Sequence, residues 1–226
     1  MHGSHGSDIL FSIFGLPVTS YVTTMWAIMG VLLIICLFVT RRLNMVPGRL
    51  QNLVEFTVEA LLNFFGGILG PEKARRYFPL LATLFLFILF SNWSGVLPGA
   101  GHVKGFRPPT STWSVTAGLA IVVFFSVQIA GVREKGLKYL KHFIEPIPVF
   151  LPMTIIEEFV KPLSLSLRLY GNIFGEETVV AVLFSLAPYF SPIPMQMLGL
   201  LFGFIQALVF TTLTAIYIAN ATAEAH

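Results

Sequence analysis

Four long stretches of this chain contain no charged residue, and they restrict its fold more than any other feature. A helix that crosses the hydrocarbon core of a bilayer needs about 20 mainly apolar residues. With 55% hydrophobic and 11% charged residues, the chain leaves no room for a separate soluble domain. We therefore expect an all-α membrane protein in which residues 1–226 form a single integral membrane domain. The uncharged stretches are Val22–Thr40, Tyr77–Val96, Trp113–Gly131 and Thr178–Ala223.

The basic residues predict how the chain is oriented in the cell membrane. Cytoplasmic loops carry an excess of lysine and arginine. The connection near residues 99–112 holds only Lys104 and Arg107, whereas the connections before and after it hold ten basic residues. We therefore expect the N-terminus outside and the C-terminus in the cytoplasm. The net charge of +3 follows from this distribution and does not indicate nucleic-acid binding. The ten are Arg41, Arg42, Arg49, Lys73, Arg75, Arg76, Arg133, Lys135, Lys138 and Lys141.

Five membrane crossings and one helix at the membrane surface account for the whole pattern. The segment Gly48–Gly67 mixes leucine, valine and phenylalanine with polar residues, among them Glu55 and Glu59. Such a segment is too polar to span easily and suits an amphipathic helix in the interface. The expected crossings are 22–40, 77–97, 113–131, the segment after about residue 150, and 193–220.

One arginine, Arg168, lies within an otherwise apolar stretch that runs from Leu165 to Asn172. A guanidinium stays protonated in any protein environment. At bilayer depth it costs roughly 2.5–3.5 kcal/mol even on the lenient insertion scale. A residue of this kind is expected to face a partner, a water-filled cavity or a moving charge, and so it indicates an ion pathway.

The last two crossings are expected to be long, steeply tilted helices that form a hairpin. From Pro152 to about Ala187 the only strong break signal is Pro162. A single helix over this range would be roughly 54 Å long, against a hydrocarbon core of about 30 Å. The alternative is two shorter helices that break near Pro162 or Gly171, and the sequence leaves both possibilities open.

Polar residues flank Arg168 on both sides along the chain. At about 100° per residue, four of them lie within roughly 40° of Arg168 around the helix. By the predicted topology Glu157, Glu158 and Lys161 belong to the inner half of the membrane, whereas Glu176 and Glu177 belong to the outer half. The inner and outer groups differ in membrane depth and in direction around the helix. This arrangement favours two separate half-pathways for an ion. The four are Glu157, Lys161, Ser164 and Asn172, and Glu158 joins the inner group.

Several of these residues also have ordinary structural explanations. Glu157 and Lys161, four apart, can pair at the inner interface, and Ser164 can bond its own backbone. Asn172 can join two helices. Gln206 is either such a link between helices or a partner of Arg168. Glu176 and Glu177 are harder to explain in this way, because carboxylates in membrane segments usually mark ion or proton routes.

These residues resemble subunit a of the bacterial F-type ATP synthase. The resemblance covers most of the chain beyond about residue 40, and the arginine motif is highly specific. It is carried by Ser164-Leu165-Ser166-Leu167-Arg168-Leu169-Tyr170-Gly171-Asn172, by Glu177, by Gln206-Ala207, by Lys161-Pro162, by Ser91-Asn92-Trp93 with Leu97-Pro98, and by the ending Ala223-Glu224-Ala225-His226.

The resemblance implies a stator for a rotating ring of c subunits, together with a b-subunit peripheral stalk and the soluble F1 sector. On this reading Arg168 faces the ring carboxylate as it loses its H⁺ or Na⁺. Glu177 with Glu176 would line the outer half-channel, and the inner acidic group with Ser164 would line the inner one. Asn172 and Gln206 would hold Arg168 or water. The subunit would not be catalytic by itself and would need no cofactor or metal.

The chain departs from the family pattern in one respect and raises a question of register in another. Many members have a small residue in place of Glu176 and a histidine or an acid in place of Gly199, so the acid and the glycine are exchanged here. Pairing the last two helices simply about their turn puts Gln206 beside Glu177. The family places this glutamine near the arginine, which requires an offset between the helices or an asymmetric turn.

A secondary transporter or ion channel that uses Arg168 as a substrate or anion site is the alternative function. No inverted repeat typical of transporters is visible in the sequence. A membrane enzyme fits less well, because the sequence shows no metal-ligand spacing and no serine or cysteine paired with a histidine at membrane depth. Copurification with a ring of small hairpin proteins and a soluble ATPase would distinguish a stator from a transporter.

Overall fold

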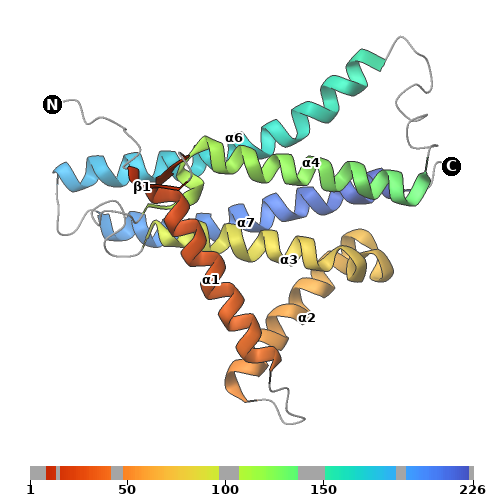
Figure 1. Cartoon of the computed structure of the whole chain (residues 1–226), viewed down its shortest axis with the longest axis horizontal. Coiled ribbons are helices and arrows are strands. Elements are labelled where there is room, and N and C mark those ends of the chain that lie inside the picture. Colours follow the sequence, from red (N-terminus) through yellow and green to blue (C-terminus); the bar gives the residue numbers. More distant parts are fainter. Residues whose placement is uncertain are drawn as a thin grey trace.

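A computed structural model of the chain describes residues 9–13, 16–41, 48–96, 107–136, 151–186 and 192–223. Long helices dominate these ranges (Figure 1). They are α1 (Ser20–Thr40), α2 (Arg49–Leu69), α3 (Pro71–Ser94), α4 (Trp113–Lys135), α6 (Leu151–Leu186) and α7 (Pro192–Thr222), with a short 3₁₀ helix η1 (Pro109–Ser111) and strands β1 (Ile9–Ile13) and β2 (Leu16–Thr19). Lys104, Lys138 and Lys141 and the expected turn near 188–191 lie outside the described residues.

All six helices are long and apolar enough to cross a membrane. This confirms a helical, multi-pass membrane protein. Helix α2 meets the same criterion as the others, so the placement of 48–67 at the membrane surface, and with it the count of five crossings, stays a prediction. The antiparallel pair β1 and β2, which precedes α1, was not anticipated from the sequence.

The predicted long helix is continuous. Helix α6 has 36 residues and contains Pro162, and α7 has 31 residues. A break near Pro162 or Gly171 is therefore wrong. Proline removes one backbone donor and crowds the preceding turn, which bends a helix without ending it when packing holds both sides. Figure 1 shows the first part of α6 inclined away from the end of α4 and the last part extending past the start of α4, beside the first part of α7.

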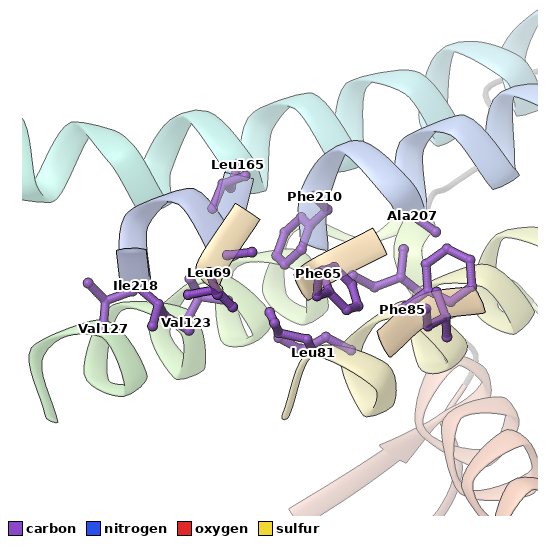
Figure 2. Close-up of a cluster of buried hydrophobic side chains, with 14 of the residues drawn as sticks. Phe65, Leu69, Leu81, Phe85, Val123, Val127, Leu165, Ala207, Phe210 and Ile218 are labelled. Atoms are coloured by element: carbon purple, nitrogen blue, oxygen red, sulfur yellow. The ribbon is translucent and has the colours of Figure 1, made fainter. Parts of the chain in front are cut away.

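The core lies where α2, α3, α4, α6 and α7 meet (Figure 2). Phe65 of α2, Leu81 of α3 and Phe210 of α7 are fully buried there. Only the second half of α2 contributes to this core, through Leu61, Phe65 and Leu69. The core orders the helices that carry Arg168 and its polar neighbours.

Helices α3 and α7 approach each other closely. A Cβ atom at Gly203 would lie 3.1 Å from the Cβ of Asn92, so glycine permits this contact. Asn92 Nδ2 donates to the carbonyl of Gly203 at 3.0 Å, and Trp93 Nε1 donates to the carbonyl of Leu200 at 3.0 Å. Small residues and interhelical hydrogen bonds are what hold helices together where lipid replaces water.

Candidate functional site

Arg168 lies on a face of α6 that points away from the bundle. Leu165, Leu169 and Ile173 are spaced four apart and are buried against the other helices. Because residues at this spacing share one face of a helix, their burial turns Arg168 outward. Its side chain is exposed, in a shallow depression that it forms with Val160, Leu163, Ser164 and Leu167.

The guanidinium of Arg168 has no hydrogen-bond or ion-pair partner among the described residues. Apolar side chains surround it on the same face, and Leu163 and Leu167 are about half exposed, at 48% and 50%. An arginine at membrane depth needs a partner or water. This face of α6 therefore suits contact with a group outside the chain.

Asn172 and Gln206 connect α6 to α7 one turn beyond Arg168. Asn172 Nδ2 donates to Gln206 Oε1 at 2.7 Å. Gln206 is 4% exposed, and its Nε2 has no hydrogen-bond partner in the described part of the chain. Gln206 thus links α6 and α7. The simple pairing of Gln206 with Glu177 about the hairpin turn is wrong.

Glu158 and Lys161 form a polar group with residues of α4 and α7. Lys161 Nζ donates to Glu158 Oε1 at 2.5 Å, and Gln128 Nε2 donates to Glu158 Oε2 at 2.9 Å. Lys161 Nζ also lies 5.9 Å from the centre of the Tyr217 ring. These side chains line a cavity between α4, α6 and α7.

Glu157 differs from its neighbour Glu158. Its carboxylate lies 3.5 Å from Lys161 Nζ, and its side chain is 67% exposed, against 19% for Glu158. The pairing of Glu157 with Lys161 expected from their spacing is therefore present, but Glu158 makes the shorter contact. Of the two acids, Glu157 is the more exposed.

Glu176 packs directly on Gly199 of α7. A Cβ atom at Gly199 would lie 1.7 Å from Glu176 Oε1 and 2.4 Å from its Cδ. The carboxylate of Glu176 thus fills the space that a side chain at position 199 would take. The exchange of acid and glycine seen in the sequence therefore joins two positions that are adjacent in space.

Glu177 reaches a different part of the molecule. Its carboxylate is influenced by Ser111 in η1 and by Arg107, which precedes η1. The neighbouring acids therefore point in different directions from α6, as their offset of about 100° around the helix predicts. In the sequence Arg107 is one of two basic residues in a connection, and Ser111 belongs to no motif. No pattern in the sequence connects either residue with Glu177.

Ser164 and Ser166 also have separate surroundings. Ser164 is exposed beside Arg168. Ser166 is 2% exposed and accepts a hydrogen bond from Trp113 Nε1 at 3.0 Å, with Thr116 Oγ1 3.3 Å away. Only Ser164 lies on the arginine face. Among the described residues, no three histidine, cysteine, aspartate or glutamate side chains are grouped to hold a metal ion.

The fold and the site define a multi-pass helical membrane protein that presents one unpaired arginine between two groups of polar side chains. Comparison with known proteins identifies the family. Residues 22–219 match the family model described as ATP synthase A chain. The chain belongs to this family.

Curated relatives agree over nearly the whole chain. It is 49% identical to ATP synthase subunit a 1 of Syntrophotalea carbinolica over 91% of this chain and 87% of that protein. It is 45% identical to ATP synthase subunit a of Moorella thermoacetica over 93% and 94%, respectively. It is 43% identical to ATP synthase subunit a of Geobacter sulfurreducens over 89% and 86%.

Proposed function

We propose that this chain is the ion-translocating stator subunit of a rotary ATP synthase and that Arg168 faces the carboxylates of a c-subunit ring. The observation that carries the proposal is the exposed guanidinium on α6, which has no partner among the described residues. Family membership supports the stator role and the contact with a c ring.

In this mechanism Arg168 supplies a permanent positive charge at the point where each ring carboxylate loses its ion. A nearby cation favours the ionised form of a carboxylate. The ring carboxylate therefore passes Arg168 in its charged form and takes up a new ion beyond it. The same fixed charge repels cations and prevents leakage between the two half-channels.

Two groups of side chains serve as the half-channels. Glu176 and Glu177 line the outer one, and Glu157, Glu158, Lys161 and Ser164 line the inner one. The separation of these groups along α6, with Arg168 and Asn172 between them, supports this division. The cavity beside Glu158 and Lys161 gives the inner group a place for water. The translocated ion is H⁺ or Na⁺.

The remaining parts of the proposal concern the assembly. The chain works together with a b-subunit peripheral stalk and the soluble F1 sector, which carries the catalytic sites. The N-terminus lies outside the cell membrane and the C-terminus in the cytoplasm. The exposed apolar residues of α1, among them Leu33, Ile34 and Phe38, suit contact with lipid or with a neighbouring helix.

Replacing Arg168 tests the proposal. Arg168→Ala is expected to abolish ion-driven ATP synthesis in membrane vesicles while the complex still assembles. Arg168→Lys should fail as well or nearly so, because an ammonium is a compact charge that can lose its proton when buried. Arg75→Ala, an exposed arginine of α3, is the matched control and should keep its activity. Synthesis near the wild-type rate in either Arg168 variant would contradict the proposed role.

A further inference from the structure

Lys161 lies close to Arg168 in direction around α6, but its side chain points elsewhere. At about 100° per residue the two positions differ by roughly 20°, and they are separated by about 10 Å along the helix. The shallow depression around Arg168 is formed with Val160, Leu163, Ser164 and Leu167. Lys161 instead lines the cavity between α4, α6 and α7. Its side chain is therefore turned from the arginine face into the bundle.

Residues of three helices hold the Lys161 ammonium in this place. Lys161 Nζ donates to Glu158 Oε1 at 2.5 Å and lies 5.9 Å from the centre of the Tyr217 ring on α7. An aromatic ring attracts an ammonium at such a distance. Gln128 of α4 donates from Nε2 to Glu158 Oε2 at 2.9 Å. Both carboxylate oxygens of Glu158 are thus engaged, one by the lysine of its own helix and one by an amide of α4.

Glu157 has a weaker hold on the same ammonium. Its carboxylate lies 3.5 Å from Lys161 Nζ, and its side chain is 67% exposed, against 19% for Glu158. Solvent weakens an exposed ion pair more than a partly buried one. The contact with Glu158, which Gln128 fixes, therefore decides where the charge of Lys161 lies.

We infer that Gln128 and Glu158 are positioning residues that keep the Lys161 ammonium off the arginine face. This inference rests on the proposed function, in which ions and ring carboxylates pass Arg168 on that face. A released Lys161 places a second permanent cation there. That charge repels the cation in the inner half-channel and competes with Arg168 for the ring carboxylate. Glu158 thus serves the inner half-channel as the anchor of Lys161.

Ion flow through the membrane sector of the assembled complex, measured in vesicles, tests this role. Glu158→Gln releases Lys161 and is expected to lower the flow about tenfold, the effect of one unit charge about 10 Å from the ion at an effective dielectric constant of about 20. Glu158→Gln combined with Lys161→Gln should recover most of the lost flow, because the displaced charge is gone. Gln128→Leu should cause a smaller loss, which Lys161→Gln relieves in the same way.

Gln51→Leu is the matched control for Gln128→Leu. Gln51 Nε2 donates to Glu55 Oε1 at 2.8 Å, so it makes the same kind of bond, but within α2 and in an exposed setting. Its loss should leave ion flow at the wild-type rate. A role of Glu158 as an ion carrier predicts the opposite result for the double variant, since removal of Lys161 does not replace a lost carboxylate.

A second measurement locates the charge of Lys161 without relying on ion flow. In the full-length chain with Cys36 replaced, Ser164→Cys places a thiol in the depression beside Arg168. Its reaction rates with a cationic and an anionic thiol reagent of equal size are compared in detergent. Gln128→Leu changes no charge, so a shift in these rates reports movement of Lys161. We expect the anionic reagent to gain about twofold over the cationic one, and Lys161→Gln to reverse this gain.

Two results would overturn the inference. One is ion flow in Glu158→Gln that Lys161→Gln does not raise. The other is an unchanged ratio of labelling rates at position 164 in Gln128→Leu. Failure of the proposed function is seen separately, as ATP synthesis that survives Arg168→Ala, because labelling at position 164 in the chain alone requires no ring and no ion flow.

Discussion

Arg168 and Arg107 carry the same charge in opposite settings. Arg107 lies against the hydroxyl and the ring of Tyr21. Arg168 has no such contact within the described ranges, and its helix face is open. An arginine with contacts inside the chain is held in place by them. An arginine without such contacts can interact with a group on another subunit. The surroundings of each guanidinium thus separate a charge that is held within the chain from one that is open to a group outside it.

At the same scale, Glu176 and Gly199 are expected to act as one unit. Glu176→Gly should lower ion-driven ATP synthesis, because it removes a carboxylate from the outer group. Glu176→Gly combined with Gly199→Glu should recover more activity than Glu176→Gly alone. The physical reason is that the two positions share one space, with a Cβ at Gly199 only 1.7 Å from Glu176 Oε1. ATP synthesis in vesicles at several outside pH values is the measurement.

Gly199→Ala is the informative control for this pair. Its new methyl group would collide with the Glu176 carboxylate, which is the end of a flexible side chain and can move. We expect a partial loss of activity in Gly199→Ala and no such loss when the same change is made in the Glu176→Gly background. If Glu176→Gly behaves like the wild type at every pH, Glu176 has no part in ion uptake, and the route runs through Glu177 alone.

At the scale of helices, the relation between two residues on the same helix could be predicted from its periodicity. The pairing of residues on two different helices depends on how the helices are offset along each other, and it could not be predicted. The pairing of Glu157 with Lys161 and the divergence of Glu176 and Glu177 follow from 3.6 residues per turn. The offset between α6 and α7, which brings Gln206 to Asn172, depends on packing along both helices. No window of sequence contains that information.

The contacts of Trp113 and Arg107 were missed for a related reason. Each joins residues that lie more than fifty positions apart in the chain, with a separation of 53 for Trp113 and Ser166 and 83 for Arg107 and Thr24. Serine and threonine are common in membrane helices and usually bond their own backbone. Nothing in the motif around Arg168 distinguishes the buried Ser166 from the exposed Ser164.

Ser166 is expected to stabilise the contact between α4 and α6. Ser166→Ala removes the acceptor for the Trp113 indole, while Thr116 Oγ1 keeps its bond to the Trp113 carbonyl at 3.1 Å. Interhelical hydrogen bonds in membrane proteins contribute about 0.6 kcal/mol on average and up to about 1.7 kcal/mol. We therefore expect the free energy of unfolding to fall by about 1 kcal/mol, measured by denaturation of the purified subunit in mixed detergent micelles.

Ser126→Ala provides the comparison for this variant. Ser126 is half-buried on α4, and its hydroxyl donates to the Val122 carbonyl of its own helix at 2.7 Å. Its loss should change the free energy of unfolding by much less than the loss of Ser166. Equal effects of the two substitutions would mean that the bond between the helices contributes nothing beyond local helix propensity.

At the scale of the whole molecule, the number of crossings depends on α2. This helix is long and apolar enough to span, yet its first half is largely exposed and only its second half joins the core. Its sequence places Glu55 and Glu59 among apolar residues. An amphipathic helix of this kind suits the membrane surface. A surface position of α2 keeps Arg41, Arg42 and Arg49 on the same side as Arg75 and Arg76, as the excess of basic residues in cytoplasmic loops requires.

Labelling of single cysteines decides between these arrangements. In a background in which Cys36, the only cysteine, is replaced, we expect Lys138→Cys to react with a membrane-impermeant thiol reagent from the inside and Lys104→Cys from the outside. Asn44→Cys, between α1 and α2, should react from the inside if α2 lies at the surface and from the outside if α2 crosses. The measurement uses vesicles of known orientation. Reversed accessibility at positions 104 and 138 would exchange the inner and outer half-channels. Labelling of position 44 from the outside would make α2 a sixth crossing and leave the assignment of the half-channels intact.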